Sequence, residues 1–287
     1  MIVEHQRLNL FEKLLFEKVV IVPPFKKHHP MPDEACFLYI FEGEYNSISE
    51  TQQLRISSQE AVLMKCGNYL SQFLKSAKTE KYEAIAVHFF PEVLQKVYRN
   101  DIPEFLKHPQ KNNRGPDMAK FDGGELLKKY IESIAFYFEN PGLVEEELLI
   151  LKLKELIMLL VKTKNAPVVQ QILSGLFSPN QYSFKEIIEA HIYSPITISE
   201  LAQLTNLSES SFKRQFKKIY KDSPARYLRN KKVEKAAALL SVSEERIGDI
   251  AFDCGFSDVA HFSATFKKIT GLSPSNYRLN HIHKTLA

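Results

Sequence analysis

Four polar or basic residues in the last third of the chain have the types and spacing needed to bind nucleic acid. They are Ser210, Lys213, Arg214 and Lys217. Phe212 and Phe216 are four residues apart, which places them on one face of a predicted helix and turns the polar residues away from that face. Arginine can donate two hydrogen bonds to guanine and lysine can neutralise phosphate, so this face could recognise DNA. An ordinary solvated helix surface is the alternative.

These residues belong to an internal repeat. Residues 198–202 match residues 247–251 at a shift of 49 positions, and the run Phe216-Lys217-Lys218-Ile219 matches Phe266-Lys267-Lys268-Ile269 at a shift of 50. The paired lysines recur at the same place in both copies, which favours nucleic-acid binding over a solvated surface. Two copies are too few for a solenoid, so the repeat indicates a duplicated supersecondary unit.

Each copy has the signals of two short helices joined by a tight turn, which is the helix-turn-helix pattern. The first copy lies at about 197–219. Thr197 and Glu200 form a capping box that starts a helix, Asn206 tolerates the left-handed conformation of the turn, and Ser208 can cap the second helix.

The second copy lies at about 244–269 and has its own set of signals. Glu244-Glu245 favour a helix start, Gly255 supplies the turn, and Ser257 is expected to cap the second helix. The lysines of this copy follow Phe262 and Phe266, so its second helix should also bury one aromatic face.

A connecting helix is predicted between the two copies, over residues 226–240. At ~1.5 Å per residue it is ~22 Å long, so it can hold two recognition helices near the ~34 Å separation of successive major grooves. Its basic residues are expected on the outer faces: Arg229, Lys231, Lys232 and Lys235. The net charge of the whole chain is +4, and the positive excess lies in residues 180–287.

The first part of the chain predicts a different architecture. Short β-branched and aromatic runs at 19–22, 35–41, 60–64 and 85–90 indicate a compact antiparallel β domain. Helical spacing takes over from Pro91 and continues to about residue 177. The fold class is therefore α+β, with an N-terminal β part at about 19–90, helices at about 91–177, and an all-α C-terminal part.

One of these helices, at 145–161, is apolar on nearly every side and needs cover on more than one side. Packing inside its own domain is one explanation. The other is a homodimer interface, with four residues as its candidates: Leu149, Leu153, Leu156 and Leu160.

Several other classes of protein are disfavoured. The three cysteines are far apart, so reduced thiols are expected rather than a disulfide framework or a zinc site. His28-His29 and His88 lack the partners of a metal-binding enzyme of the cupin type, so we expect no catalytic residues, metal or cofactor. No apolar run is long enough to span a bilayer and no secretory signal is present, so a cytoplasmic protein is expected.

The second copy of the repeat resembles a known family. The resemblance is carried by Ala251, Gly255-Phe256, Phe262, Phe266-Lys267, Gly271, Ser273-Pro274 and Tyr277-Arg278, and it extends over about Tyr182 to Arg278. This pattern is similar to the AraC/XylS family of bacterial transcription regulators. The resemblance implies a seven-helix domain with two helix-turn-helix motifs, which binds double-stranded promoter DNA and usually activates transcription by contacting RNA polymerase.

The resemblance also implies which residues face the DNA grooves. In the first copy they are Ser210, Lys213 and Arg214, with Lys217 beside them. In the second copy they are Val259, Ala260, His261, Ala264 and Lys267. Valine and alanine offer no hydrogen bonds to bases, so sequence specificity should depend mainly on the first copy.

Over the N-terminal part the sequence more loosely resembles the ExsA-like regulators, in Cys36 to Phe41 and Gly43-Glu44. This implies a cupin-like β-barrel sensor with helices that dimerise. Independently of the resemblance, Pro167, Gly175 and Ser178-Pro179 indicate an interdomain connection, which gives domains at 1–178 and 179–287. The expected function is a DNA-binding transcription regulator, an activator controlled by a small ligand. A protein partner in place of the ligand is the alternative, and a cupin-type enzyme is a remote one.

Overall fold

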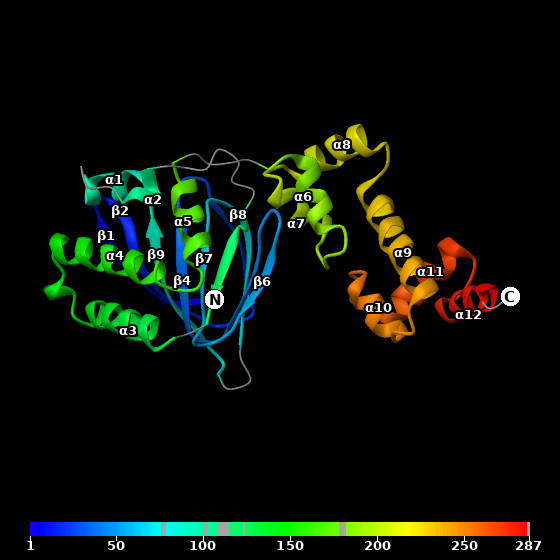
Figure 1. The fold of residues 1–287 in the computed structure, drawn as a ribbon, viewed down its shortest axis with the longest axis horizontal. Coiled ribbons are helices and arrows are strands. Elements are labelled where there is room, and N and C mark those ends of the chain that lie inside the picture. The colour runs from blue at the N-terminus through cyan, green and yellow to red at the C-terminus, as the bar shows by residue number, and fades with distance from the viewer. Residues whose placement is uncertain (76–78, 100–102, 108–114, 123, 178–181, 286–287) are drawn as a thin grey trace. The chain divides into compact units, whose positions relative to one another are not determined.

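The computed structural model describes residues 1–75, 79–99, 103–107, 115–122, 124–177 and 182–285 (Figure 1). Two compact units are distinguished by their internal contacts, Met1–Tyr182 and Ser183–Ala287. The predicted domain boundary, between residues 178 and 179, lies outside the described residues, so it stays a prediction.

The first unit contains two antiparallel sheets. The six-stranded sheet has the order β1 (Ile2–Leu10), β2 (Lys13–Ile21), β9 (Tyr82–Phe89), β4 (Ala35–Glu42), β7 (Ala61–Met64) and β10 (Met118–Phe121). The four-stranded sheet has the order β3 (Phe25–Met31), β8 (Gly67–Leu74), β5 (Glu44–Ile48) and β6 (Gln53–Ile56).

Strand β4 shows how one sheet serves two cores. Successive side chains of a strand point to opposite faces. Cys36, Leu38 and Ile40 join a core that also takes residues from the four-stranded sheet. Phe37 and Tyr39 join a second core, which takes residues from the helices. Both faces of β4 are therefore buried, which explains its continuous apolar run.

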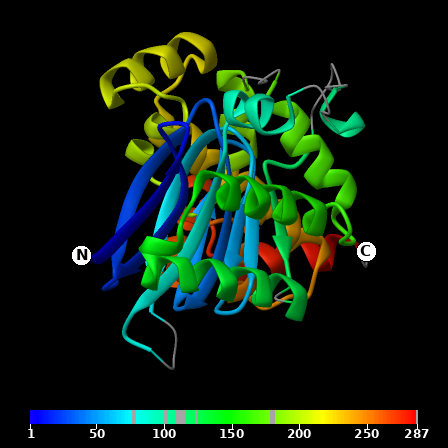
Figure 2. The same cartoon turned by 90° about the vertical axis from the view of Figure 1, so that its left-hand side faces the viewer.

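The helices of the first unit are α1 (Pro91–Tyr98), α2 (Glu104–Lys107), α3 (Glu125–Glu139), a short 3-10 helix (Pro141–Leu143), α4 (Glu146–Leu160) and α5 (Ala166–Gly175). Figure 2 shows α3 and α4, in green, lying across the face of the strands. Their buried residues complete the second core.

Three sequence expectations for this unit need correction. The described strands form two sheets rather than one closed cupin-like barrel. The β region begins at Ile2 rather than at residue 19, because β1 and β2 form a hairpin that extends the larger sheet. Strand β10 lies in the part predicted to be helical, where it pairs with β7 at the sheet edge.

The leucines chosen for a dimer interface also need correction. Leu149, Leu153, Leu156 and Leu160 are all buried, at most 4% exposed, in the core of their own chain. The apolar residues that α4 leaves exposed are Leu151 and Met158. These four leucines are therefore packing residues, while dimerisation itself stays a prediction.

The second unit is helical. Its described helices are α6 (Phe184–His191), α7 (Ile198–Leu204), α8 (Glu209–Tyr220), α9 (Pro224–Val242), α10 (Ile247–Asp253), α11 (Val259–Thr270) and α12 (Pro274–Thr285). Helix α9 is longer at both ends than the predicted 226–240, because Ser223 caps it and Pro224 occupies its first turn. Across the described residues, no helix is long and apolar enough to cross a membrane.

Candidate functional site

The first helix-turn-helix is formed by α7 and α8. Thr197 Oγ1 accepts the Glu200 amide at 3.2 Å while Glu200 Oε2 accepts the Thr197 amide at 2.9 Å, so the predicted capping box is present. Asn206 has a φ of +54° in the turn, and Ser208 caps α8 by accepting the Ser211 amide. The local signals therefore fix where α8 begins and in which direction it leaves the turn.

The faces of α8 divide as the sequence predicts. Phe212 and Phe216 are fully buried, and their rings pack on Phe184 of α6. The polar set is exposed along the helix: Ser210, Lys213, Arg214 and Lys217. Lys213 pairs with Glu209 at 2.5 Å. No ion pair to Arg214 occurs among the described residues, so its guanidinium can bind an outside group.

The second helix-turn-helix is formed by α10 and α11, around Gly255 at a φ of +78°. Two of its predicted signals need correction. Asp258, not Ser257, caps α11, because its two carboxylate oxygens accept the amides of Ala260 and His261 at 3.2 and 2.7 Å. These hydrogen bonds hold the pKa of Asp258 below its usual value. Helix α10 starts at Ile247, beyond Glu244-Glu245.

Helix α11 repeats the aromatic face but has a less polar outer surface. Phe262 and Phe266 are fully buried. The exposed set comprises Ala260, His261, Ala264 and Lys267. Val259 is half-buried against the core of the second helix-turn-helix, so it is less accessible than the resemblance implies. This helix therefore offers few hydrogen-bonding groups for base recognition.

The basic residues of α9 differ in their surroundings. Arg229 is exposed as predicted. Lys232 and Lys235 are half-buried, and their ammonium groups donate to backbone carbonyls instead of pointing outward. The prediction for these two lysines was wrong because the carbonyls that bind them come from residues distant in the sequence.

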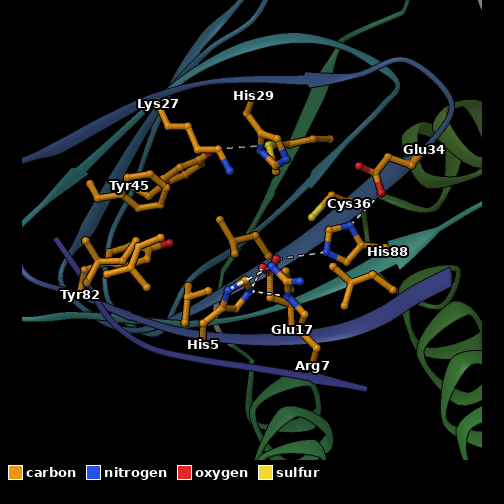
Figure 3. Close-up of a pocket in the computed structure, with 18 of the residues that line it drawn as sticks. His5, Arg7, Glu17, Lys27, His29, Glu34, Cys36, Tyr45, Tyr82 and His88 are labelled. Carbon is orange, nitrogen blue, oxygen red and sulfur yellow. Dashed lines mark hydrogen bonds and ion pairs between the residues drawn. The ribbon is translucent and has the colours of Figure 1, made fainter. Parts of the chain in front are cut away.

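A second candidate site is a pocket of about 410 Å³ in the first unit. Tyr45 and Tyr82 lie at its apolar end (Figure 3), and the Phe73 ring packs against both of them. The Tyr82 side chain is fully buried there, and its hydroxyl has no hydrogen-bond partner among the described residues. Burial raises the pKa of Tyr82 well above its ordinary value, so the hydroxyl stays a donor.

The polar end of the pocket is a charged network centred on His88. Its Nδ1 lies 2.9 Å from Glu34 Oε2, and its Nε2 lies 3.4 Å from Glu17 Oε2. Burial lowers the pKa of His88, but the two carboxylates outweigh burial and raise it to about 9. Burial raises the pKa of Glu17, but His88 and His5 outweigh it and lower the value to about 2. The network is therefore charged at neutral pH.

Sequence reasoning did not find this network, since it treated His88 as an isolated residue. Glu17, Glu34 and His88 are far apart in sequence, and only the register of β2, β9 and β4 brings them together. His88 within the otherwise apolar run of residues 84–90 was the available signal, and nothing in the sequence pointed to its two partners. No group of three side chains suited to holding a metal ion occurs in the part of the chain that the structure describes.

Comparisons with known proteins agree with the helical unit and extend to the first unit. The family model of a helix-turn-helix domain matches residues 201–280, and the model of the ExsA N-terminal regulatory domain matches residues 35–172. The transcriptional regulator ExsA of Pseudomonas aeruginosa is 27% identical over 248 residues, which cover 83% of this chain and 84% of ExsA.

Other relatives match about a third of the chain. The transcriptional activator RhaS of Klebsiella pneumoniae is 38% identical over 91 residues, which are 32% of this chain and 33% of RhaS. The probable regulator LumQ of Photobacterium leiognathi is 29% identical over 99 residues. The match covers 34% of this chain and 40% of LumQ. The chain has two copies of a helix-turn-helix motif and a first unit of the ExsA type. It therefore belongs to the AraC/XylS family of DNA-binding transcription regulators.

Proposed function

We propose that this chain activates transcription by placing α8 and α11 in successive major grooves of a promoter and by contacting RNA polymerase. The observation that carries the proposal is the exposed set Ser210, Lys213, Arg214 and Lys217 on α8, opposite a fully buried aromatic face. These side chains supply both kinds of contact that a DNA reader needs, to base edges and to phosphates. The exposed Lys267 of α11 adds a phosphate contact.

Specificity in this proposal comes mainly from α8. Arg214 can donate a bidentate pair of hydrogen bonds to guanine, whereas Ala260 and Ala264 of α11 can contact only thymine methyl groups. His261 is exposed next to Ala260, and its ring nitrogens can form a hydrogen bond with a base edge. We expect a site with one strongly specified half and one weakly specified half.

A small ligand in the N-terminal pocket is the proposed control. Two features support it, the pocket volume of about 410 Å³ and the buried Tyr82 hydroxyl that has no partner among the described residues. A buried donor without an acceptor costs about 1–3 kcal/mol, so a ligand that supplies an acceptor would recover that energy. The expected effector is a small, largely apolar molecule with a hydrogen-bond acceptor.

A protein effector is the second candidate. Its support is a group of exposed apolar residues on α3 and α4: Leu126, Phe136, Leu151 and Met158. The same residues could instead meet a second copy of the chain, which we propose as the basis of a homodimer. The Tyr82→Phe variant distinguishes regulation by a small ligand from regulation by a protein, because it removes the hydrogen-bond donor of the pocket and leaves α3 and α4 unchanged.

In vitro transcription tests the function. A duplex selected by the protein from a random library is placed upstream of a weak promoter, and transcripts made by purified RNA polymerase are counted with and without the protein. We expect several-fold more transcript with the wild type and a smaller increase with Arg214→Ala at the same protein concentration. An equal or lower yield with the wild type would contradict activation, and a lower yield would indicate a repressor.

A further inference from the structure

The two helix-turn-helix units have separate cores. Phe212 and Phe216 pack in a cluster with residues of α6 and α7. Phe262 and Phe266 pack in another cluster with residues of α10 and the second half of α9. Leu228 of α9 belongs to the first cluster, while Val233 belongs to the second. Helix α9 thus contributes to both cores, and among the described residues the two cores have no buried residue in common.

A direct backbone contact joins the units beside α9. The turn that follows α6 contains Tyr193 and Ser194, and it lies against Gly255 in the turn of the second helix-turn-helix. A Cβ at Gly255 would lie only 2.2 Å from the Tyr193 carbonyl oxygen. The two turns are therefore in direct backbone contact, which leaves no room for a side chain at position 255.

Lys232 of α9 binds both turns at once. Its ammonium donates to the Ser194 carbonyl at 3.0 Å and to the Gly255 carbonyl at 2.9 Å. One acceptor lies in the turn that leads into the first helix-turn-helix, and the other lies in the turn of the second. Burial lowers the pKa of Lys232, so the charge is partly removed from water and its two carbonyl contacts become correspondingly stronger.

Lys235 reinforces the same contact three residues later on α9. Its ammonium donates to the Asp253 carbonyl at 2.8 Å and lies 4.4 Å from the centre of the Tyr193 ring. Asp253 is the last residue of α10 in the second helix-turn-helix, and Tyr193 lies in the turn between α6 and α7 of the first. The two lysines therefore bind the same pair of turns at adjacent points. The hydrogen bonds of Lys232 are partly buried, whereas that of Lys235 is exposed.

We propose that Lys232 is a positioning residue that sets the spacing between the two DNA contacts. It holds the turns of both units so that α8 and α11 keep one relative orientation. This inference rests on the proposed binding of DNA by both helices. Each base pair inserted between the two half-contacts moves the second one by about 3.4 Å and rotates it by about 34°. Two helix-turn-helix motifs held in one relative orientation cannot reach both half-contacts after this shift, whereas two motifs that move relative to each other can.

The experiment measures binding to duplexes of different spacing. A duplex selected by the wild-type full-length chain is remade with one or two base pairs inserted or removed between its half-contacts, and each dissociation constant is measured. Lys232→Met keeps the length of the side chain and removes the ammonium. Lys231→Met is the matched control, because it removes the same charge from the same helix but loses only local contacts within α9, an exposed pair with Glu234 and a position 6.0 Å from the centre of the Tyr227 ring.

We expect the wild type and Lys231→Met to lose about tenfold or more in affinity for one inserted base pair. For Lys232→Met we expect weaker binding to the selected duplex but a penalty of less than about threefold for the insertion. An unchanged penalty in Lys232→Met would overturn the inference. A wild type that selects no duplex would instead contradict the proposed function.

A second measurement does not depend on DNA. Nitroxide labels are attached through Lys218→Cys on α8 and Lys268→Cys on α11, with the half-buried Cys66 replaced by serine. We expect one narrow distribution of label distances in the chain that keeps Lys232 and a broader one when Lys232→Met is added, with the same helix content by circular dichroism. Equally narrow distributions would overturn the inference, even if the variant bound DNA poorly.

Discussion

The carboxylate of Asp117 lies 2.7 Å from the ammonium of Lys65, and Asp117 is fully buried. Hydroxyls of Ser49, Thr51 and Tyr182 donate to the same carboxylate at 2.5 to 2.7 Å. Burial raises the pKa of Asp117, but Lys65 and the hydroxyls of Ser49 and Thr51 outweigh burial and lower the pKa below its ordinary value. This carboxylate therefore holds together several loops of the first unit and its last residue.

Asp117→Ala should destabilise the first unit by about 3–5 kcal/mol, because it leaves Lys65 buried without its counter-charge. Urea unfolding followed by circular dichroism measures the change. Asp122→Ala is the control, since Asp122 pairs with Lys164 at a similar 2.6 Å but both groups are exposed. We expect little change there. Equal effects of the two substitutions would show that burial of the pair does not matter.

The His88 network predicts how stability depends on pH. The folded-state pKa of His88 is raised from 6.5 to about 9, so its stabilisation is complete below pH 6.5 and is lost as the pH rises through about 9. Glu17 has the opposite sign. Its pKa is lowered to about 2, so its stabilisation is present above pH 4.5 and is lost as the pH falls through about 2.

Thermal unfolding between pH 6 and 10 tests the alkaline limb. The wild-type Tm should fall over this range by more than the Tm of His88→Gln, which cannot lose a proton there. The difference between the two curves isolates His88 from other titrating groups. Parallel curves would mean that His88 is not charged in the folded protein.

Arg214 predicts a base-specific effect. Arg214→Ala should cost about 1–3 kcal/mol of binding energy and relax the preference at one base position. Arg214→Lys is the informative partner variant, because lysine keeps the charge but cannot form the bidentate pair. We expect it to lose the preference as well. Binding of a set of single-base variants measures this, and a uniform loss on every duplex would make Arg214 a phosphate contact.

The exposed lysines of α8 and α11 predict a strong dependence on salt. If about six phosphates are neutralised, the logarithm of the association constant should fall with the logarithm of salt concentration with a slope near −5. Lys217→Ala should reduce the steepness of that slope by about 1. A slope near zero for the wild type would contradict an electrostatic DNA contact.

The outer face of α4 predicts self-association. Leu151 and Met158 are 64% and 63% exposed and seven residues apart, so they lie on one face of the helix. Light scattering at micromolar concentration should give twice the 33.1 kDa of one chain. Leu151→Glu with Met158→Glu should give a folded monomer, while Lys162→Glu, beyond the helix end, should stay dimeric. A wild-type monomer, free and on DNA, would contradict the dimer.

Local signals explain why the helical unit was largely predictable. The Thr197–Glu200 capping box, Asn206 and Gly255 each act within a few residues, so they mark the turns without knowledge of the rest of the fold. Where two neighbouring residues could serve, the sequence was ambiguous. Ser257 and Asp258 can both cap a helix, and only the backbone direction decides for Asp258.

The parts that depend on strand register were not predictable in the same way. The hairpin of β1 and β2 was missed because Ile2–Leu10 contains mostly polar, exposed residues and is held by its pairing with β2. In α4, apolar residues surround the helix, so periodicity could not say that Leu153 faces the core while Leu151 does not. Tertiary packing makes both choices.

The most direct test of the account compares the affinity of the full-length chain for a selected duplex with its affinity for random duplex of equal length at physiological salt. A base-reading regulator should bind the selected duplex about 10³-fold or more tightly. Arg214→Ala should reduce that ratio more than it reduces binding to the random duplex. Equal affinity of the wild type for both duplexes would contradict sequence-specific recognition by α8.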